Sequence, residues 1–325
     1  MTWDERVAVV VDHGFTDRQA GFLVTVMLHA GVCLGRHYCT FARIAYGQRM
    51  HDFFRKLVAK GYATVRRCGH NTARLYHVHH KPLYAAIGEA DNRYRKAVPL
   101  ARAVERLMLL DAVLSERDLR WLATEQEKVG YFTLTHRVAR TDLPALTFRS
   151  HTSQTIRYFP DKLPIGIGDD GRTFVLVYLV TRPVPVDFRM FLERHAELLR
   201  ALPAWTLRMV APHHLADAAT RYREAFREQI GTPLRPTHLD ELRWYFNARK
   251  RDSSTRDERY QLASRAFHTA RFRVLYRAWL EHGDRMLDAT ASPVLQNAIA
   301  RHTGQWEWRV LPHRYLHLAP LVGTA

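Results

Sequence analysis

The stretch FARIAYGQRMHDFFRKLVAKGYATVRR, residues 41–67, decides the fold of the N-terminal part of this chain. Apolar residues recur at helical spacing from Met50 to Val58 and Gly61 ends the pattern, which predicts an amphipathic helix over residues 48–60. The next segments, YATVRR at 62–67 and ARLYHV at 73–78, predict two strands. A turn rich in Gly and Asn joins them, so the stretch predicts a helix followed by a hairpin.

Two further helices are expected before this stretch. The segment QAGFLVTVMLHAG at 19–31 carries an apolar stripe that starts after Thr16 and stops at Gly31, and residues 37–45 predict a second, shorter helix. Three helices followed by a basic hairpin are typical of a winged helix-turn-helix domain. We therefore expect such a domain at residues 1–81.

The remainder of the chain predicts a different architecture. Residues 81–96 predict a linker helix, and residues 100–114 carry an apolar stripe wide enough to require burial, against a second domain or a partner subunit. Further helices are expected at 116–130, 188–202, 239–252 and 258–283. Strands are expected at 143–150, 155–160, 165–170, 173–181 and 205–212, and Thr173 to Val180 is expected to be the central strand. In the tail, residues 306–322, apolar and polar residues alternate, which is typical of a hairpin at the edge of a sheet. The expected fold class is α+β, with a linker helix at 82–98, a central mixed α/β domain at 99–230 and an Arg-rich, mainly helical region at 231–325.

Composition and charge favour a polyanionic partner. The chain has 325 residues, of which 47% are hydrophobic and 25% charged, as in ordinary globular proteins. Lys and Arg outnumber Asp and Glu by 49 to 32, which gives a net charge of +17 and a pI near 10.2. Only seven of the basic residues are Lys. Codon usage accounts for this preference for Arg over Lys, but it does not account for the excess of basic over acidic residues. Nucleic acid is the usual partner of such a chain.

Basic residues concentrate between residues 43 and 81. This segment contains nine Lys and Arg residues and a single acidic residue, Asp52. In a winged helix the third helix enters the major groove, where Arg pairs with guanine and Gln with adenine, so Gln48, Arg49 and Arg55 are the expected base readers. Phosphate contacts are expected from the hairpin and from Lys60. The complete expected set of DNA-binding residues is Arg43, Gln48, Arg49, His51, Asp52, Arg55, Lys56, Lys60, Arg66, Arg67, Asn71 and Arg74. The alternative is a protein-docking module whose charges form a solvated surface.

Cysteine usage and the N-terminus predict a cytoplasmic protein with no membrane partner, and the expected DNA binding places it on the nucleoid. Three cysteines form no disulfide framework, the N-terminus lacks the pattern of a signal peptide, and no apolar run reaches the roughly 18 residues that span a bilayer. A candidate zinc site comprises Cys68, His70, His77, His79 and His80. Its spacing is looser than known zinc motifs, so no metal or other cofactor is expected.

The order of elements around residues 155–180 resembles the PD-(D/E)xK nuclease core, in which an Asp after one strand and an acid-x-Lys on the next together hold a metal ion and activate water. Asp161 is the candidate first acid. The next strand, Phe174 to Val180, contains no Asp, Glu or Lys, so the metal cage is incomplete and no catalysis is expected.

Four segments together resemble replication-relaxation type winged-helix proteins of plasmids and integrative mobile elements. They are TDRQAGFLVTVML, the stretch at 41–67, ARLYHV and PDKLPIG. The resemblance covers roughly the first 215 residues and implies a DNA-binding accessory factor or regulator with an inert, nuclease-like second domain. Residues 231–325 have no counterpart in that family.

These patterns predict a sequence-specific double-stranded DNA-binding protein that is not an enzyme, either a transcription regulator or a replication or recombination accessory factor of a mobile element. One winged helix makes a small interface, so a homodimer is expected. Residues 100–114 are the first candidate contact, although burial within the chain is the more usual role of such an apolar stripe. Other mobile-element proteins are further candidate partners. Two alternatives remain open: a metal-dependent nuclease, and a non-catalytic module that binds protein or RNA.

Overall fold

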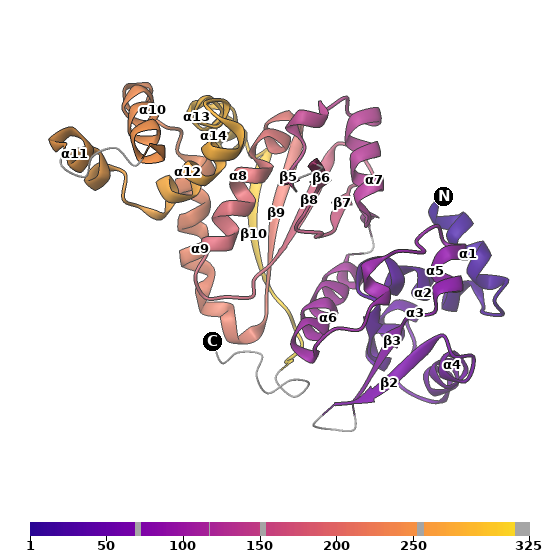
Figure 1. Ribbon diagram of the computed structural model, residues 1–325. Helices are drawn as coiled ribbons and strands as arrows, with labels where there is room; N and C mark the ends of the chain where they lie inside the picture. Colours follow the sequence, from indigo (N-terminus) through magenta and orange to yellow (C-terminus); the bar gives the residue numbers. More distant parts are fainter. Residues whose placement is uncertain (69–72, 117, 150–153, 252–256, 316–325) are drawn as a thin grey trace.

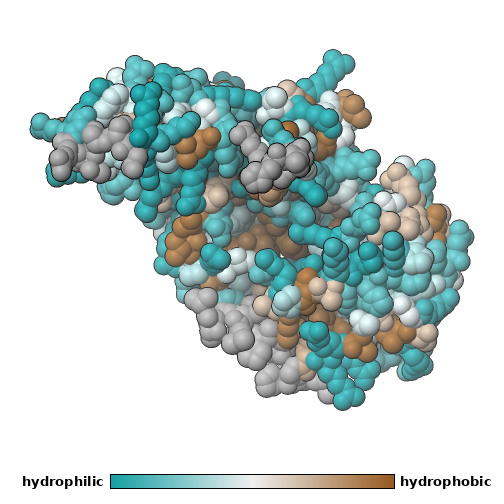
Figure 2. All heavy atoms as spheres, in the orientation of Figure 1, coloured by the Kyte–Doolittle hydropathy of each residue, from teal (hydrophilic) through white to brown (hydrophobic). Residues whose placement is uncertain are grey.

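The computed structural model describes residues 1–68, 73–116, 118–149, 154–251 and 257–315 (Figure 1). Helices make up 56% and strands 16% of the described residues, which confirms the mixed α and β composition. Among the described residues, no helix combines the length and apolar character needed to cross a membrane. Hydrophilic residues cover most of the helices at the upper left of Figure 2, and hydrophobic residues gather in a recess at the centre of that view.

The N-terminal unit contains four helices and a small antiparallel sheet of strand order β1-β3-β2. Its elements are α1 (Trp3–Val11), α2 (Asp17–His29), β1 (Val32–Cys33), α3 (Gly35–Ala42), α4 (Gln48–Ala59), β2 (Ala63–Arg67) and β3 (Arg74–Val78). The helices and strands expected here are present. Sequence analysis missed β1 and also α1, whose N-terminus is closed by a capping box between Thr2 and Glu5.

Residues 81–96 form two short helical segments in place of the single linker helix expected. They are α5 (Lys81–Ala86) and the 3₁₀ segment η1 (Arg93–Arg95). Gly88, which adopts a φ of 80°, lies between them, and this left-handed conformation interrupts the helix.

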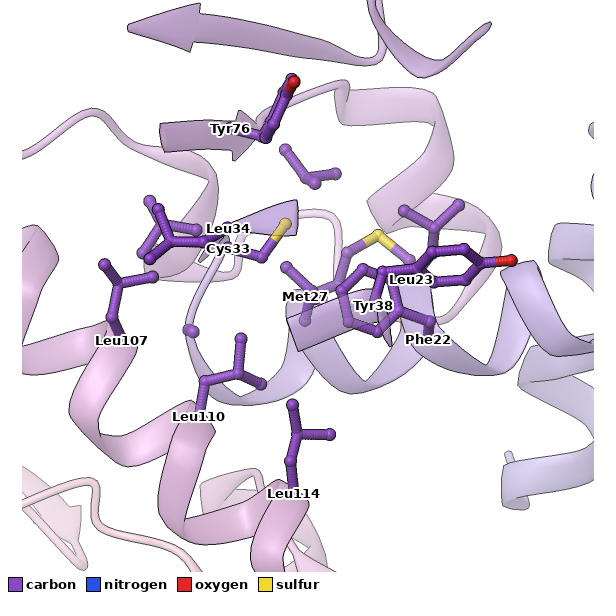
Figure 3. Close-up of a cluster of buried hydrophobic side chains, with 14 of the residues drawn as sticks. Phe22, Leu23, Met27, Cys33, Leu34, Tyr38, Tyr76, Leu107, Leu110 and Leu114 are labelled. Carbon is purple, nitrogen blue, oxygen red and sulfur yellow. The ribbon is translucent and has the colours of Figure 1, made fainter. Parts of the chain in front are cut away.

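Helix α6 (Leu100–Ser115) lies between the N-terminal unit and the central sheet, and its apolar side is buried by the same chain. Figure 3 shows Leu107, Leu110 and Leu114 pointing toward Cys33, Leu34 and Met27 of the N-terminal unit. The same core cluster includes Val177 and Val210 of the sheet. The apolar stripe is therefore covered within the same chain, which is one of its two expected forms of burial, and it does not provide the candidate dimer contact at residues 100–114.

The central sheet has five strands in the order β10-β9-β8-β7-β4. The strands are β4 (Arg120–Leu122), β7 (Ile165–Ile167), β8 (Thr173–Leu179), β9 (Ala204–Ala211) and β10 (Gly304–Val310). Strand β8 is in the middle, as expected from its continuous apolar character. Helix α8 (Val186–Ala201) connects it to the parallel strand β9, and β4 and β7 are antiparallel additions at the other edge.

Two expected helices are divided in the structure. Residues 116–130 form β4 and then α7 (Glu125–Gly130), because Thr124 and Glu127 make a capping box that starts a new helix. Residues 258–283 form α11 (Glu258–Ala266) and α12 (Ala270–His282).

The remaining elements complete the two faces of the sheet and the C-terminal helices. They are the hairpin β5 (Ala145–Arg149) and β6 (Gln154–Tyr158), the π-helical segment η2 (Tyr131–Thr135), the 3₁₀ segments η3 (Arg140–Asp142) and η4 (His213–Ala218), α9 (Ala219–Phe226), the π-helical segment η5 (Arg227–Gly231), α10 (Pro236–Lys250), α13 (Arg285–Ala291) and α14 (Val294–Ala300). Helices α10 to α13 share a separate core cluster around Leu242, Phe246 and Leu287.

Strand β10 is an edge strand, as expected for the tail, but it runs parallel to β9 and is not half of a hairpin within the described residues. It joins the central sheet across the expected boundary at residue 230. The chain then leaves β10 and runs back to the lower end of α6 (Figure 1).

Candidate nucleic-acid interface

Helix α4 is held against the N-terminal unit by aromatic packing. Phe53 stacks on Tyr38 with ring centroids 4.4 Å apart, and Phe54 stacks on Tyr76 at 4.0 Å. Both phenylalanines are about 1% exposed. Such pairs add to the hydrophobic burial of two large side chains, so the orientation of α4 about its axis is firmly set and one polar face is presented to solvent.

That exposed face carries a hydrogen-bonded chain of three side chains. Gln48 donates through Nε2 to Asp52 Oδ1 at 2.7 Å, and Arg55 donates through Nη1 to the same oxygen at 2.9 Å. The side chain of Arg55 remains 70% exposed in this ion pair. Two of the expected base readers are thus adjacent, and Asp52 links them and neutralises part of the charge of Arg55.

Lys56 and Lys60 lie on one flank of α4, where they hold the loop between α1 and α2. Lys56 Nζ donates to the carbonyl of Gly14, and Lys60 Nζ donates to the carbonyl of His13 at 3.1 Å. Lys56 Nζ also lies 5.3 Å from the ring centroid of Phe15. Both lysines are nevertheless exposed, so the phosphate contact expected of Lys60 stays a prediction.

His51 lies on the opposite flank, beside a groove with a volume of about 620 Å³. Its ring packs edge-on against Tyr46 at 5.5 Å, and Tyr46 is 67% exposed. Arg74 of β3 and Arg314 of the C-terminal segment also line this groove. Sequence analysis missed Tyr46 and Arg314. An aromatic residue shortly before a predicted helix was an available signal for Tyr46. No local pattern indicates that residue 314 lies beside this groove.

The hairpin of β2 and β3 presents its basic residues to solvent. All of β2 after Ala63 is exposed, including Arg66 and Arg67, and Arg74 is exposed at the start of β3. Arg43 is exposed at the end of α3 with a φ of 54°, and Arg49 is exposed in the first turn of α4. Asn71 lies outside the described residues. The eleven other expected DNA-binding residues are all exposed, in two groups around α4 and the hairpin.

A buried charge network lies behind this surface. Asp111 of α6 accepts from both terminal nitrogens of Arg36, with Nη2 to Oδ2 at 2.7 Å, and its Oδ1 lies 3.1 Å from His37 Nε2. Burial opposes ionisation of Asp111, but its contacts with His37 and Arg36 hold its pKa below the ordinary value. Burial lowers the pKa of His37, whose Nδ1 accepts from the backbone amide of Leu34. The network fixes α3 against α6.

The central domain brings Asp161 near a lysine that sequence analysis did not single out. Asp161 accepts two hydrogen bonds from Arg194 Nη1, at 2.7 and 2.8 Å. Lys128 is buried, which lowers its pKa to about 7, and its ammonium donates to the carbonyl of Leu163 at 2.7 Å. Both groups are committed to internal contacts, so this arrangement supports the structure of the turn after β6.

Metal-ligating side chains do not cluster among the residues that the structure describes: no group of three or more His, Cys, Asp or Glu has a geometry that could hold an ion. Of the five candidate zinc ligands, His70 lies outside the described residues. Burial raises the pKa of the Cys68 thiol, His77 Nε2 lies 3.1 Å from the carbonyl of Tyr94, and His80 caps α5. These contacts give His77 and His80 structural roles.

Comparison with known proteins identifies no relative: no protein-family model, curated protein or solved structure matches the chain.

Proposed function

We propose that the protein binds double-stranded DNA sequence-specifically through a winged helix formed by α2, α3, α4 and the three-stranded sheet. The observation that carries the proposal is the exposed polar face of α4 directly beside the exposed basic residues of β2 and β3. The element order α2-β1-α3-α4-β2-β3 and the strand order β1-β3-β2 support the proposal, because a winged helix is expected to place three helices before a hairpin. A helix of this kind fits the major groove, and a basic hairpin fits the adjacent backbone.

The residues divide into three roles. Gln48, Arg49 and Arg55 read base edges, and Arg66, Arg67 and Arg74 contact phosphates and set the salt dependence. Lys56 and Lys60 support the fold of the domain through the carbonyls of Gly14 and His13. Arg43 and His51 flank the helix and contact the backbone.

The biological role that fits these residues is a transcription regulator or a replication or recombination accessory factor of a mobile element, bound to the nucleoid. This role rests on the sequence resemblance of the N-terminal 215 residues, and so does the expectation of other mobile-element proteins as partners. A homodimer on a two-fold site would provide the affinity that one winged helix lacks. Because α6 is buried within the subunit, the dimer contact must lie elsewhere.

The proposal is tested with the variants Arg55→Ala and Arg66→Ala. After footprinting on DNA that flanks the gene has identified a preferred site, the affinity of each variant is measured for that site and for random duplex. Arg55→Ala should lose about 1 to 3 kcal/mol on the preferred site and much less on random DNA, whereas Arg66→Ala should weaken both equally. Arg301→Ala, an exposed change beyond α14, is the matched control.

Two results would contradict the proposal. If Arg55→Ala kept the full site preference, α4 would not read the sequence. If RNA of the same sequence bound as tightly as duplex DNA, readout by a helix in the major groove would be excluded, because that groove is too narrow in A-form RNA.

A further inference from the structure

The chain after β10 returns to the N-terminal unit as a short segment, Leu311–Tyr315, which we name the C-terminal strap. At its start the Leu311 amide donates to the carbonyl of Ala211 at 2.8 Å, which continues the pairing of β10 with β9. At its end Tyr315 is only 3% exposed, and its hydroxyl donates to Asp111 Oδ2 at 2.5 Å. Both ends of the strap are therefore fixed.

The anchor of the strap is the buried charge network that holds α3 against α6. Tyr315 binds the carboxylate that also binds Arg36, and the Arg36 guanidinium lies 5.9 Å from the centroid of the Tyr315 ring. A hydrogen bond to a charged acceptor that is largely removed from water is among the stronger ones in proteins. The strap is thus tied to the element that precedes α4.

Between its two anchors the strap places His313 and Arg314 beside the groove of about 620 Å³ next to α4. The other residues that contribute polar or aromatic side chains to this groove are Arg36, Tyr46, His51, Arg74 and Tyr76. None of its described lining residues is acidic. The charge of Arg36 is balanced by Asp111, whereas Arg74 and Arg314 form no ion pair with a carboxylate among the described residues.

The groove lies between the start of α4 and the part of β3 nearest the hairpin turn, at Ala73, Arg74 and Tyr76. If α4 occupies the major groove and the hairpin follows the outside of the duplex, one DNA backbone must pass between them. Guanidinium groups bind phosphate oxygens in a forked geometry, and a phosphodiester carries the negative charge that this groove lacks.

We propose that the C-terminal strap is part of the DNA interface, and that Arg314 together with Arg74 binds a backbone phosphate of the strand beside α4. This inference rests on the proposed DNA-binding function. It assigns a role in DNA binding to a segment that follows the central sheet, more than two hundred residues after α4.

The test measures duplex affinity across a salt titration for the full chain and for Arg314→Ala, Arg74→Ala and the double variant. Arg314→Ala should weaken binding about 3- to 10-fold on the preferred site and on random duplex alike, and the slope of log affinity against log salt should fall by roughly 0.9 for one lost phosphate. Arg301→Ala should match the unaltered chain. Circular dichroism and thermal unfolding confirm that each variant is folded.

A second variant, Tyr315→Phe, tests the anchor while it retains the ring. Releasing the strap from Asp111 should reduce affinity in the same direction as Arg314→Ala but less, with Arg314 itself intact. An ethylation-interference footprint gives the position of the contact: Arg314→Ala should lose interference at a phosphate adjacent to the bases that Arg55→Ala affects.

The outcomes separate this inference from the proposed function. If Arg55→Ala and Arg66→Ala weaken binding but Arg314→Ala binds with unchanged affinity and salt slope, the strap is not part of the interface. If millimolar inorganic phosphate protects the folded chain from thermal unfolding through Arg314 while duplex affinity is independent of that residue, the groove binds free phosphate and the inference is wrong. If the unaltered chain binds no duplex, both proposals fail.

Discussion

Asp52 is the acid at the centre of the proposed base-reading face, and its role follows from its two hydrogen bonds. It accepts from Gln48 and Arg55, so it holds these side chains in place before DNA is bound. It also introduces a negative charge into a surface that would approach a polyanion.

We predict that Asp52→Asn binds random duplex about 2- to 5-fold more tightly than the unaltered chain, with a steeper salt dependence, because the charge of Arg55 is then fully available to phosphates. Fluorescence anisotropy with a labelled random duplex measures this change. Asp17→Asn, in an exposed acid at the start of α2, serves as the control. A loss of site preference in Asp52→Asn would instead assign cytosine readout to Asp52.

The burial of His195 in α8 predicts that the stability of the folded chain decreases in acid. Burial lowers its pKa to about 4 from an ordinary value of 6.5, and its Nδ1 donates to the carbonyl of Phe191 at 2.9 Å. Between pH 6.5 and 4 the unfolded chain binds a proton at this residue that the folded chain does not, so the free energy of unfolding decreases as the pH falls through that range.

The expected contribution of His195 at pH 5 is a loss of about 2 kcal/mol relative to pH 7. In His195→Gln the difference between the unfolding free energies at pH 7 and pH 5 should be smaller by this amount. Urea unfolding at the two pH values measures it, with His238→Gln at an exposed histidine as control. An unchanged pH dependence in His195→Gln would show that the histidine is protonated in the folded chain.

The exposed residues of the candidate interface could be predicted, because the helical period that buries Met50 and Phe53 necessarily exposes Gln48, Asp52 and Arg55. The contacts of Lys56 and Lys60 could not. Their partners are backbone carbonyls in a loop more than forty residues earlier, and a side-chain pattern contains no information on such acceptors.

At the scale of elements, local signals determined the helices and strands, and long-range packing determined their neighbours. The apolar run of β8 correctly indicated a central strand, because a strand covered on both faces has no polar side. The same reasoning did not reveal that residues 120–122 form an edge strand. That strand is only three residues long, and its pairing with β7 depends on the tertiary structure.

Close approach of β10 to β9 depends on Gly304. A Cβ at this position would lie 2.5 Å from Trp205 Cζ2, and Trp205 is only 1% exposed, so its ring has no space to move. We predict that Gly304→Ala lowers the free energy of unfolding by about 1 to 3 kcal/mol through overpacking. Urea unfolding measures the change.

Gly130→Ala is the matched control for this prediction, because no heavy atom lies within 4 Å of a Cβ built there. Equal stability of Gly304→Ala and the unaltered chain would mean that β10 is not packed as the structure describes it.

At the scale of the whole molecule, α6 joins the N-terminal unit to the central sheet in one core cluster. An amphipathic pattern shows that a face is buried but not which partner covers it, and for this reason sequence analysis left two possibilities for residues 100–114. The structure covers the face with β1, α2, α3 and β8 of the same chain.

We predict that Leu107→Asp prevents folding of the chain and does not produce a folded monomer. Leu107 is 1% exposed, and an unpaired carboxylate there costs several kcal/mol. Circular dichroism and light scattering distinguish the two results. Leu262→Asp, at a position that is 59% exposed, should remain folded. A folded, monomeric Leu107→Asp protein would restore α6 as a subunit contact.

The hydrogen bond between Asp111 and Tyr315 joins residues that are 204 positions apart. At ordinary rates of translation the tyrosine leaves the ribosome roughly 10 to 40 seconds after the aspartate, and N-terminal domains usually fold while synthesis continues. A nascent chain therefore exposes α4 before the strap exists. If the proposed DNA binding and the proposed role of the strap are correct, the affinity of the nascent chain for nucleic acid is lower before the strap has formed than afterwards.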